Sequence, residues 1–218
     1  MVKTSPRLNA ALELLDYANR IMDIGTDHGY FPIMAITSGK AKTAIATDNK
    51  AMPLLTATAN VAKANLSDKI MLSLQDGLTK LPLDVDCVSI MGMGGKRICS
   101  LLDLGNLDRV RQLILGPNID HFELRDWLEN HDFVITGERF VRDCGHDYQL
   151  FSAIHGKMHL SHSEKQYGPF IIKEKSELFV GHIEHQIMLL NQAMSLAKNP
   201  QKRLDLAKQI TTLKELVL

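Results

Sequence analysis

Two acids, two glycines and a histidine lie within residues 23–29, DIGTDHG, where an apolar segment ends. A turn that only reverses the chain needs one glycine, whereas additional glycines let a ligand approach the backbone closely. The acids Asp23 and Asp27 favour an amino group or another cation, because carboxylates repel the phosphates that bind such turns. The stretch therefore predicts a ligand-binding turn.

Acids, amides and glycines also follow the other predicted strands of this chain. In a parallel sheet, the carboxyl ends of the strands meet at one edge, and ligands bind there. We therefore expect one site to gather these residues from five strand ends. The candidates for cofactor binding are Asp23, Gly25, Asp27, His28, Gly29, Asp48, Asn49, Asp76, Gly77, Gly92 and Met93.

Short apolar runs alternate with helical patterns through the first two thirds of the chain. The predicted strands are RIMDIG, TAIATD, KIMLSLQDG, DCVSIMGMGG and VRQLILGPN, followed by FVITGERFVRD and YQLFSAIHG with no helix between them. Alternation of this kind predicts a parallel α/β sheet with helices on both faces. The last two strands predict an antiparallel edge hairpin, which is typical of the Rossmann-like class I methyltransferase sheet. Asp120 is the expected cap of the helix DHFELRDWLENH.

The pattern changes after Gly156. Ile183, Ile187, Leu190, Met194 and Ala197 step by four, three, four and three residues, which predicts a coiled-coil-like helix. A second helix with Leu206, Ile210, Leu213 and Val217 follows the break at Pro200. We expect a catalytic domain over 1–156 and a helical hairpin over 157–218.

Composition limits the function classes. The 218 residues carry no net charge, but residues from Lys157 onward have 9 Lys and Arg against 6 Asp and Glu, which suits an anionic partner. No apolar run is long enough to span a membrane. Three widely spaced cysteines favour a reducing compartment, so we expect a cytoplasmic protein, monomeric or weakly dimeric. The histidines fit no zinc-binding spacing, and no metal is expected.

The choice of cofactor depends on Asp27. Asp48, 23 residues beyond Gly25, is placed to accept hydrogen bonds from ribose hydroxyls, which both a nicotinamide cofactor and S-adenosylmethionine possess. A pyrophosphate would be repelled by Asp23 and Asp27, whereas an amino group or a sulfonium-bearing chain would be attracted. The sequence therefore favours S-adenosylmethionine, with Asp76 and Gly77 at the adenine.

The motifs DIGTDHGYFP, ATDN, QDGL and IMGMGG together resemble those of the bacterial tRNA adenine-N1 methyltransferases of the TrmK type. The resemblance continues through LILGPNIDHFELRDWLENHDFVITGE and into the helical tail that YGPFIIKEKSELF introduces. It implies methylation of N1 of an adenine in the tRNA D-loop, at tRNA position 22. One departure is visible, because Gly116 stands where that family typically has Gln before Pro-Asn.

A reaction at adenine N1 sets the expected roles. The nitrogen carries its own lone pair, so no general base is needed, and catalysis consists of positioning and stabilising the positive charge on the base. Asp27 is the candidate for facing that charge, Tyr30 for stacking or hydrogen bonding, and Asn118 for contacting the adenine edge. Under this resemblance the tail helps to seat the tRNA.

Two other functions are compatible with the sequence. One is methylation of a small molecule or a protein, with the tail as a dimerisation element. The other is a non-catalytic scaffold that keeps the cofactor fold. The acids and glycines at all the strand ends count against a scaffold, which does not need them.

Overall fold

The computed structural model describes residues 5–218, which divide into two compact units. The first unit extends to Tyr167 and the second is Gly168–Leu218. The segment 157–167 therefore lies with the first unit. Within the described residues no helix is both long and apolar enough to cross a membrane.

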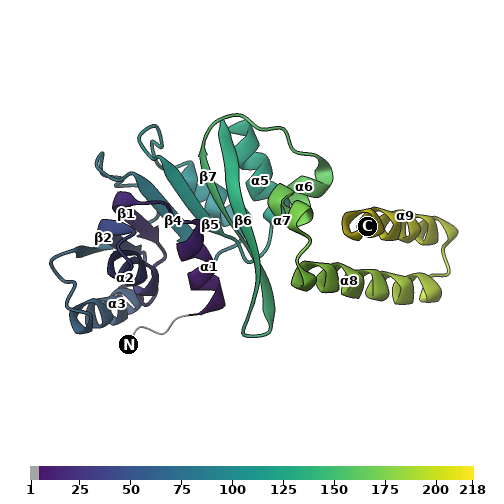
Figure 1. The fold of residues 1–218 in the computed structure, drawn as a ribbon, viewed down its shortest axis with the longest axis horizontal. Helices are drawn as coiled ribbons and strands as arrows, with labels where there is room; N and C mark the ends of the chain where they lie inside the picture. The colour runs from purple at the N-terminus through teal and green to yellow at the C-terminus, as the bar shows by residue number, and fades with distance from the viewer. Residues whose placement is uncertain (1–4) are drawn as a thin grey trace. The chain divides into compact units, whose positions relative to one another are not determined.

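The first unit is built on one seven-stranded sheet with the order β3-β2-β1-β4-β5-β7-β6 (Figure 1). The strands are β1 (Ala18–Ile24), β2 (Ala41–Asp48), β3 (Ile70–Leu74), β4 (Cys87–Met91), β5 (Gln112–Gly116), β6 (Phe133–Asp143) and β7 (His146–His155). The first five are parallel, β7 is antiparallel to β5, and β6 pairs with β7 at the edge. The predicted α/β class with an antiparallel edge hairpin is confirmed.

Helices cover both faces of this sheet (Figure 1). They are α1 (Pro6–Leu14), α2 (Tyr30–Thr37), α3 (Ala51–Lys63), α4 (Gly95–Leu102) and α5 (His121–Asn130), with the short α6 (His162–Tyr167) after the last strand. Ala11, Phe31 and Val61 bring α1, α2 and α3 into one buried cluster. Leu101 and Leu124 bring α4 and α5 into a second cluster. Burial on both faces explains why the central strands β4 and β5 are almost continuously apolar.

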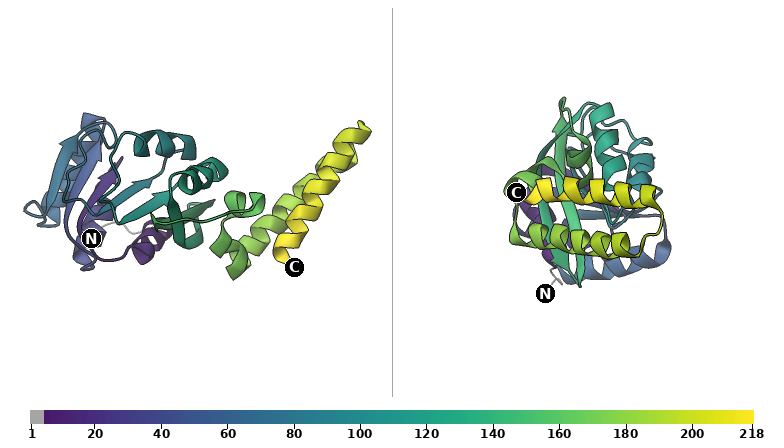
Figure 2. Two further views of the ribbon diagram at one scale, coloured as in Figure 1. Left: turned by 90° about the horizontal axis from the view of Figure 1, so that it is seen from above. Right: turned by 90° about the vertical axis from the view of Figure 1, so that its right-hand side faces the viewer.

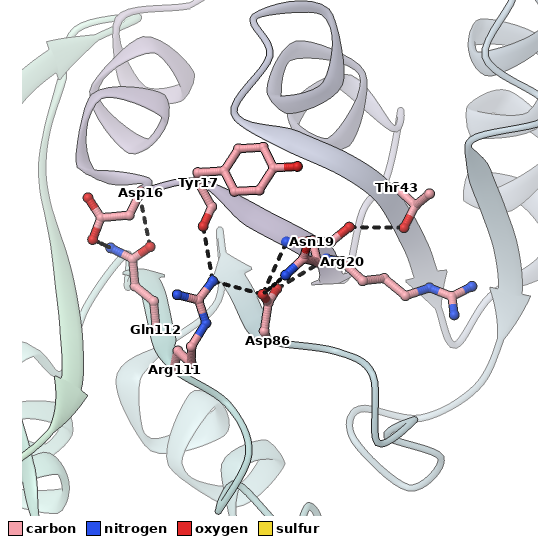
Figure 3. Close-up of polar contacts among 8 residues, drawn as sticks. All are labelled: Asp16, Tyr17, Asn19, Arg20, Thr43, Asp86, Arg111 and Gln112. Carbon is pink, nitrogen blue, oxygen red and sulfur yellow. Dashed lines mark hydrogen bonds and ion pairs between the residues drawn. The ribbon is translucent and has the colours of Figure 1, made fainter.

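The amino-terminal ends of the strands are tied together by one carboxylate (Figure 3). Asp86, just before β4, accepts hydrogen bonds from the backbone N–H groups of Asn19 and Arg20, each at 3.1 Å, and from Arg111 Nη2 at 2.8 Å. Burial alone would raise the pKa of Asp86, but these hydrogen bonds hold it below its ordinary value. The carboxylate thus fixes β1 and β4 in register at the edge opposite the predicted site.

Helix α1 is held against the sheet by polar side chains at its carboxyl end. Lys40 Nζ donates to the carbonyl oxygens of Leu12 and Leu15, both at 2.7 Å. Gln112 Nε2 donates to the carbonyl oxygen of Leu14 at 2.9 Å. Carbonyls at a helix end have no partner within the helix, so these contacts satisfy them and fix the helix in place.

Asp120 is the N-cap residue of α5 as predicted, but it does not cap the helix through its side chain. The Asp120 side chain makes no capping hydrogen bond and its φ is 59°. The turn is determined instead by α4, whose Gly95 donates from its backbone N–H to the carbonyl oxygen of Ile119 at 2.9 Å. Packing of two loops has overridden the local capping preference.

The second unit consists of α7 (Pro169–Glu174), α8 (Glu177–Leu196) and α9 (Pro200–Val217). Helices α8 and α9 lie side by side in both views of Figure 2. Of the predicted inner positions, Ile183, Ile210 and Leu213 are buried. The buried position in the last turn is Leu216, whereas the predicted Val217 is only half-buried.

Candidate functional site

A cavity of about 590 Å³ opens at the carboxyl ends of β1, β2 and β4. Of the predicted residues it brings together Asp23, Gly25, Asp27, His28, Tyr30, Asp48, Asn49, Gly92 and Met93. Its volume lies in the range of small-molecule and cofactor sites. Three of the five predicted strand ends therefore meet at this cavity, and the ends of β3 and β5 do not line it.

The turn after β1 is shaped by backbone conformations that favour glycine. Gly25 and Gly29 both have a φ of 70°, and Asp27 between them has a φ of 52°. A Cβ on Gly25 would overlap the terminal methyl group of Met93, so the β1 turn and the β4 loop touch there. Gly29 lies outside the cavity lining, where a Cβ would be 3.3 Å from that of Ala57. It allows α2 to start close against α3.

Asp23 is a buried acid at the base of the cavity. Its side chain accepts a hydrogen bond from Ser89 Oγ at 2.6 Å, and the residue is 4% exposed. Burial raises the pKa of Asp23 to about 6, and the Ser89 hydroxyl opposes this rise. No ion pair with a basic side chain of the described residues offsets this burial, so an ionised Asp23 destabilises the protein, and that cost is typical of a functional position.

The other polar side chains of the turn are exposed to the cavity. His28 Nε2 lies 3.4 Å from Asp27 Oδ2, and the His28 and Tyr30 rings stack with centroids 5.3 Å apart. Asp48, at the end of β2, accepts a hydrogen bond from the Lys50 backbone N–H at 2.9 Å through Oδ1. This contact orients the Asp48 carboxylate at the mouth of the cavity.

Asn118 does not line the cavity but supports the loop that does. Its Nδ2 donates to the carbonyl oxygen of Gly92 at 2.8 Å, and its backbone N–H donates to the carbonyl oxygen of Met93 at 2.8 Å. The Gly92 N–H in turn donates to the carbonyl oxygen of Gly116 at 3.0 Å. Gly92 has a φ of 78°, in the left-handed region that favours glycine. This conformation and the three hydrogen bonds together define the path of the loop.

Asp76 and Gly77 are also outside the cavity lining. Asp76 Oδ1 accepts a hydrogen bond from Arg97 Nη2 at 2.8 Å. A Cβ on Gly77 would be 2.5 Å from a methyl group of Leu101, so this glycine is needed for packing.

Sequence reasoning missed one wall of the cavity. Ser5, Arg7 and Leu8 of the α1 segment line it, together with Asp143 and Cys144 at the β6–β7 turn. None of these residues follows a parallel strand, so the strand-end pattern has no signal for them. The described part of the chain contains no cluster of three or more His, Cys, Asp or Glu residues that would hold a metal ion.

Comparison with known proteins gives a consistent family. A family model described as TrmK, tRNA (adenine(22)-N(1))-methyltransferase, matches residues 21–215. The tRNA (adenine(22)-N(1))-methyltransferase of Bacillus subtilis is 30% identical, and the match covers 99% of this chain and 98% of the relative.

Solved structures agree in fold over the whole chain. A Streptococcus pneumoniae protein in complex with S-adenosyl-L-methionine has a TM-score of 0.90 at 32% identity, with complete coverage of both chains (100%). The Mycoplasma capricolum TrmK structure with S-adenosyl-homocysteine has a TM-score of 0.87 at 29% identity, covering 100% of this chain and 98% of that one.

Proposed function

Since the chain belongs to the TrmK family of tRNA (adenine(22)-N(1))-methyltransferases, we propose that it transfers the methyl group of S-adenosylmethionine to N1 of adenine 22 in tRNA. The observation that carries this proposal is the cavity at the ends of β1, β2 and β4, where an acidic, glycine-shaped turn meets a side-chain-poor loop.

The lining residues fit this cofactor. Asp48 is positioned for the ribose hydroxyls, while Asp23 and Asp27 suit an amino group and disfavour a pyrophosphate. Gly25 keeps the cavity clear where a Cβ would collide with Met93. We propose that His28, Gly29, Asn49 and Gly92 complete the cofactor site, with Asp76 and Gly77 on its adenine side. When bound, S-adenosylmethionine supplies an electrophilic methyl group attached to a sulfonium.

The chain's own residues then need only to hold the target adenine and stabilise its charge. The N1 lone pair is available near neutral pH, so no side chain has to remove a proton before transfer. The ring becomes positively charged as the N1–carbon bond forms, and Asp27 is the exposed carboxylate of the turn that faces this charge. Tyr30 offers a ring for the flipped base to stack on. Asn118 acts through Gly92, whose carbonyl it holds in place.

The second unit is proposed to help seat the tRNA. Helix α9 exposes Lys202, Arg203, Lys208 and Lys214, against the acids Asp205 and Glu215. Exposed cations of this kind bind phosphates without reading sequence. We further propose that the enzyme is cytoplasmic and monomeric or weakly dimeric, which its three free cysteines allow.

The experiment that tests this function is a transfer assay with two matched RNAs. Purified protein is incubated with labelled S-adenosylmethionine and unmodified tRNA carrying A22, and separately with the same tRNA carrying G22. The proposal expects label as N1-methyladenosine only in the A22 transcript. Equal labelling of both transcripts would contradict the position. No labelling of either, with cofactor still bound, would move the substrate to a small molecule or a protein.

A further inference from the structure

The wall of the cavity that the strand-end pattern does not predict carries a cation. The lining contains one arginine, Arg7 of α1, and one lysine, Lys50 at the start of α3. Lys50 directly precedes α3, next to Asp48, at the proposed ribose end. Arg7 comes from α1 and lies beside the β4 loop, where its Nη1 is 3.9 Å from the position of a Cβ on Gly92.

The Arg7 guanidinium packs against an aromatic ring and makes no ion pair with a carboxylate of residues 5–218. Its Cζ lies 4.8 Å from the centroid of the Tyr148 ring, which is a cation–π distance. Its Nε is buried and has no hydrogen-bond partner among the described residues. A buried donor without a partner is costly, and a cost of this kind is typical of a functional position.

The position of Arg7 is fixed by the helix that carries it. Ser5 caps α1 by accepting from the Leu8 backbone N–H at 3.3 Å. At the other end, Lys40 and Gln112 bind the terminal carbonyls of α1. The guanidinium is therefore preorganised toward the cavity, which lowers the entropy cost of binding an anion.

We propose that Arg7 binds the α-carboxylate of the methionine part of S-adenosylmethionine. This inference rests on the proposed cofactor. The amino group and the carboxylate are attached to one carbon, so their binding groups must be neighbours. Asp23, near the end of β1, and Asp27, in the turn after it, suit the amino group. This turn touches the β4 loop at Met93. Arg7 lies beside that same loop, and its planar fork matches a carboxylate.

An RNA phosphate is the alternative anion, and binding measurements without RNA separate the two. Isothermal titration calorimetry would compare S-adenosylhomocysteine with 5′-methylthioadenosine, a related thioether nucleoside that lacks both the amino group and the carboxylate. For Arg7→Gln we expect about a tenfold or greater loss of affinity for S-adenosylhomocysteine, because a charged hydrogen bond is lost. Affinity for 5′-methylthioadenosine should stay unchanged. Arg7→Lys should lose less than Arg7→Gln.

The matched control is Arg139→Gln. Arg139 also contacts α1, through an ion pair with Glu13 at 3.1 Å, but it does not line the cavity. The Arg139→Gln variant should leave the affinities for S-adenosylhomocysteine and for 5′-methylthioadenosine unchanged. Unaltered S-adenosylhomocysteine binding in Arg7→Gln, with a raised KM for tRNA, would overturn the proposal in favour of a phosphate. Equal losses for both nucleosides would overturn it in favour of a role in holding α1. None of these titrations depends on tRNA being the substrate.

Discussion

Replacement of the buried acid Asp23 by asparagine is expected to stabilise the protein while weakening its site. Asp23 is 4% exposed, and the fold raises its pKa from 3.8 to about 6. The folded state thus holds the proton more tightly than the unfolded chain does. The protonated Asp23 therefore contributes to the free energy of unfolding below pH 4. This contribution is lost as the pH rises toward 6 and does not return at higher pH.

The size of the effect follows from the two pKa values. Each pH unit between them corresponds to 1.36 kcal/mol, so the ionised Asp23 lowers the free energy of unfolding by about 3 kcal/mol above pH 6. The amide of Asp23→Asn has the same shape and still accepts a hydrogen bond from Ser89, but it cannot ionise. We therefore expect the variant to be more stable by about 3 kcal/mol at pH 8 and nearly equal to wild type at pH 4.

Urea unfolding of the cofactor-free protein, repeated between pH 4 and pH 8, measures this difference. The cofactor must be absent, because an amino group bound beside Asp23 would lower its pKa. Asp27→Asn is the matched control, since it removes an exposed carboxylate from the same turn. A difference in stability that is the same at pH 4 and pH 8, or a variant less stable at pH 8, would refute the reasoning. S-adenosylhomocysteine affinity should fall in the same variant.

Three further outcomes are expected. Asp86→Asn should lower the free energy of unfolding by about 1–3 kcal/mol at pH 7, by urea titration. Because the fold lowers the pKa of Asp86, its contribution is lost as pH falls below about 4, and the variant and wild type should converge there. Arg125→Met should cost about 3–5 kcal/mol, because it removes the guanidinium that donates two hydrogen bonds to the fully buried Glu138 carboxylate, and Arg125→Met with Glu138→Leu should recover part of this. Asp27→Asn should lower turnover at saturating cofactor about tenfold or more, whereas the exposed Asp108→Asn should not; equal turnovers in the tRNA assay would remove Asp27 from catalysis.

The fold and one side of the site were predictable because they depend on local pattern and on a general property of parallel sheets. Apolar runs of strand length alternate with helical spacing, and the topology follows. Asp23, Gly25 and Asp48 could be placed together because strand ends converge at one edge. No knowledge of loop conformation was needed for that step.

The other side of the site depends on tertiary packing that no local pattern encodes. Arg7 precedes the first strand and lines the cavity from α1, whose carboxyl end is held by Lys40 and Gln112. Asn118 was expected to contact the substrate, yet its amide is turned to the Gly92 carbonyl by the path of the β4 loop. Asp76 likewise pairs with Arg97, 21 residues away. Each side chain has a partner set by a loop geometry that the sequence does not display.

The departure at Gly116 shows how such packing changes the meaning of a motif. Gly116 ends β5 and its carbonyl oxygen accepts the Gly92 N–H, so its backbone helps to shape the loop beside the cavity. A Cβ there would be 3.0 Å from Met91 Cγ, which is tighter than an ordinary contact, and 3.4 Å from Leu150 Cδ2. Met91 itself lines the cavity. In this chain the space that a longer residue would need is therefore filled by the apolar Met91, while Asn118 secures the same loop from the next turn.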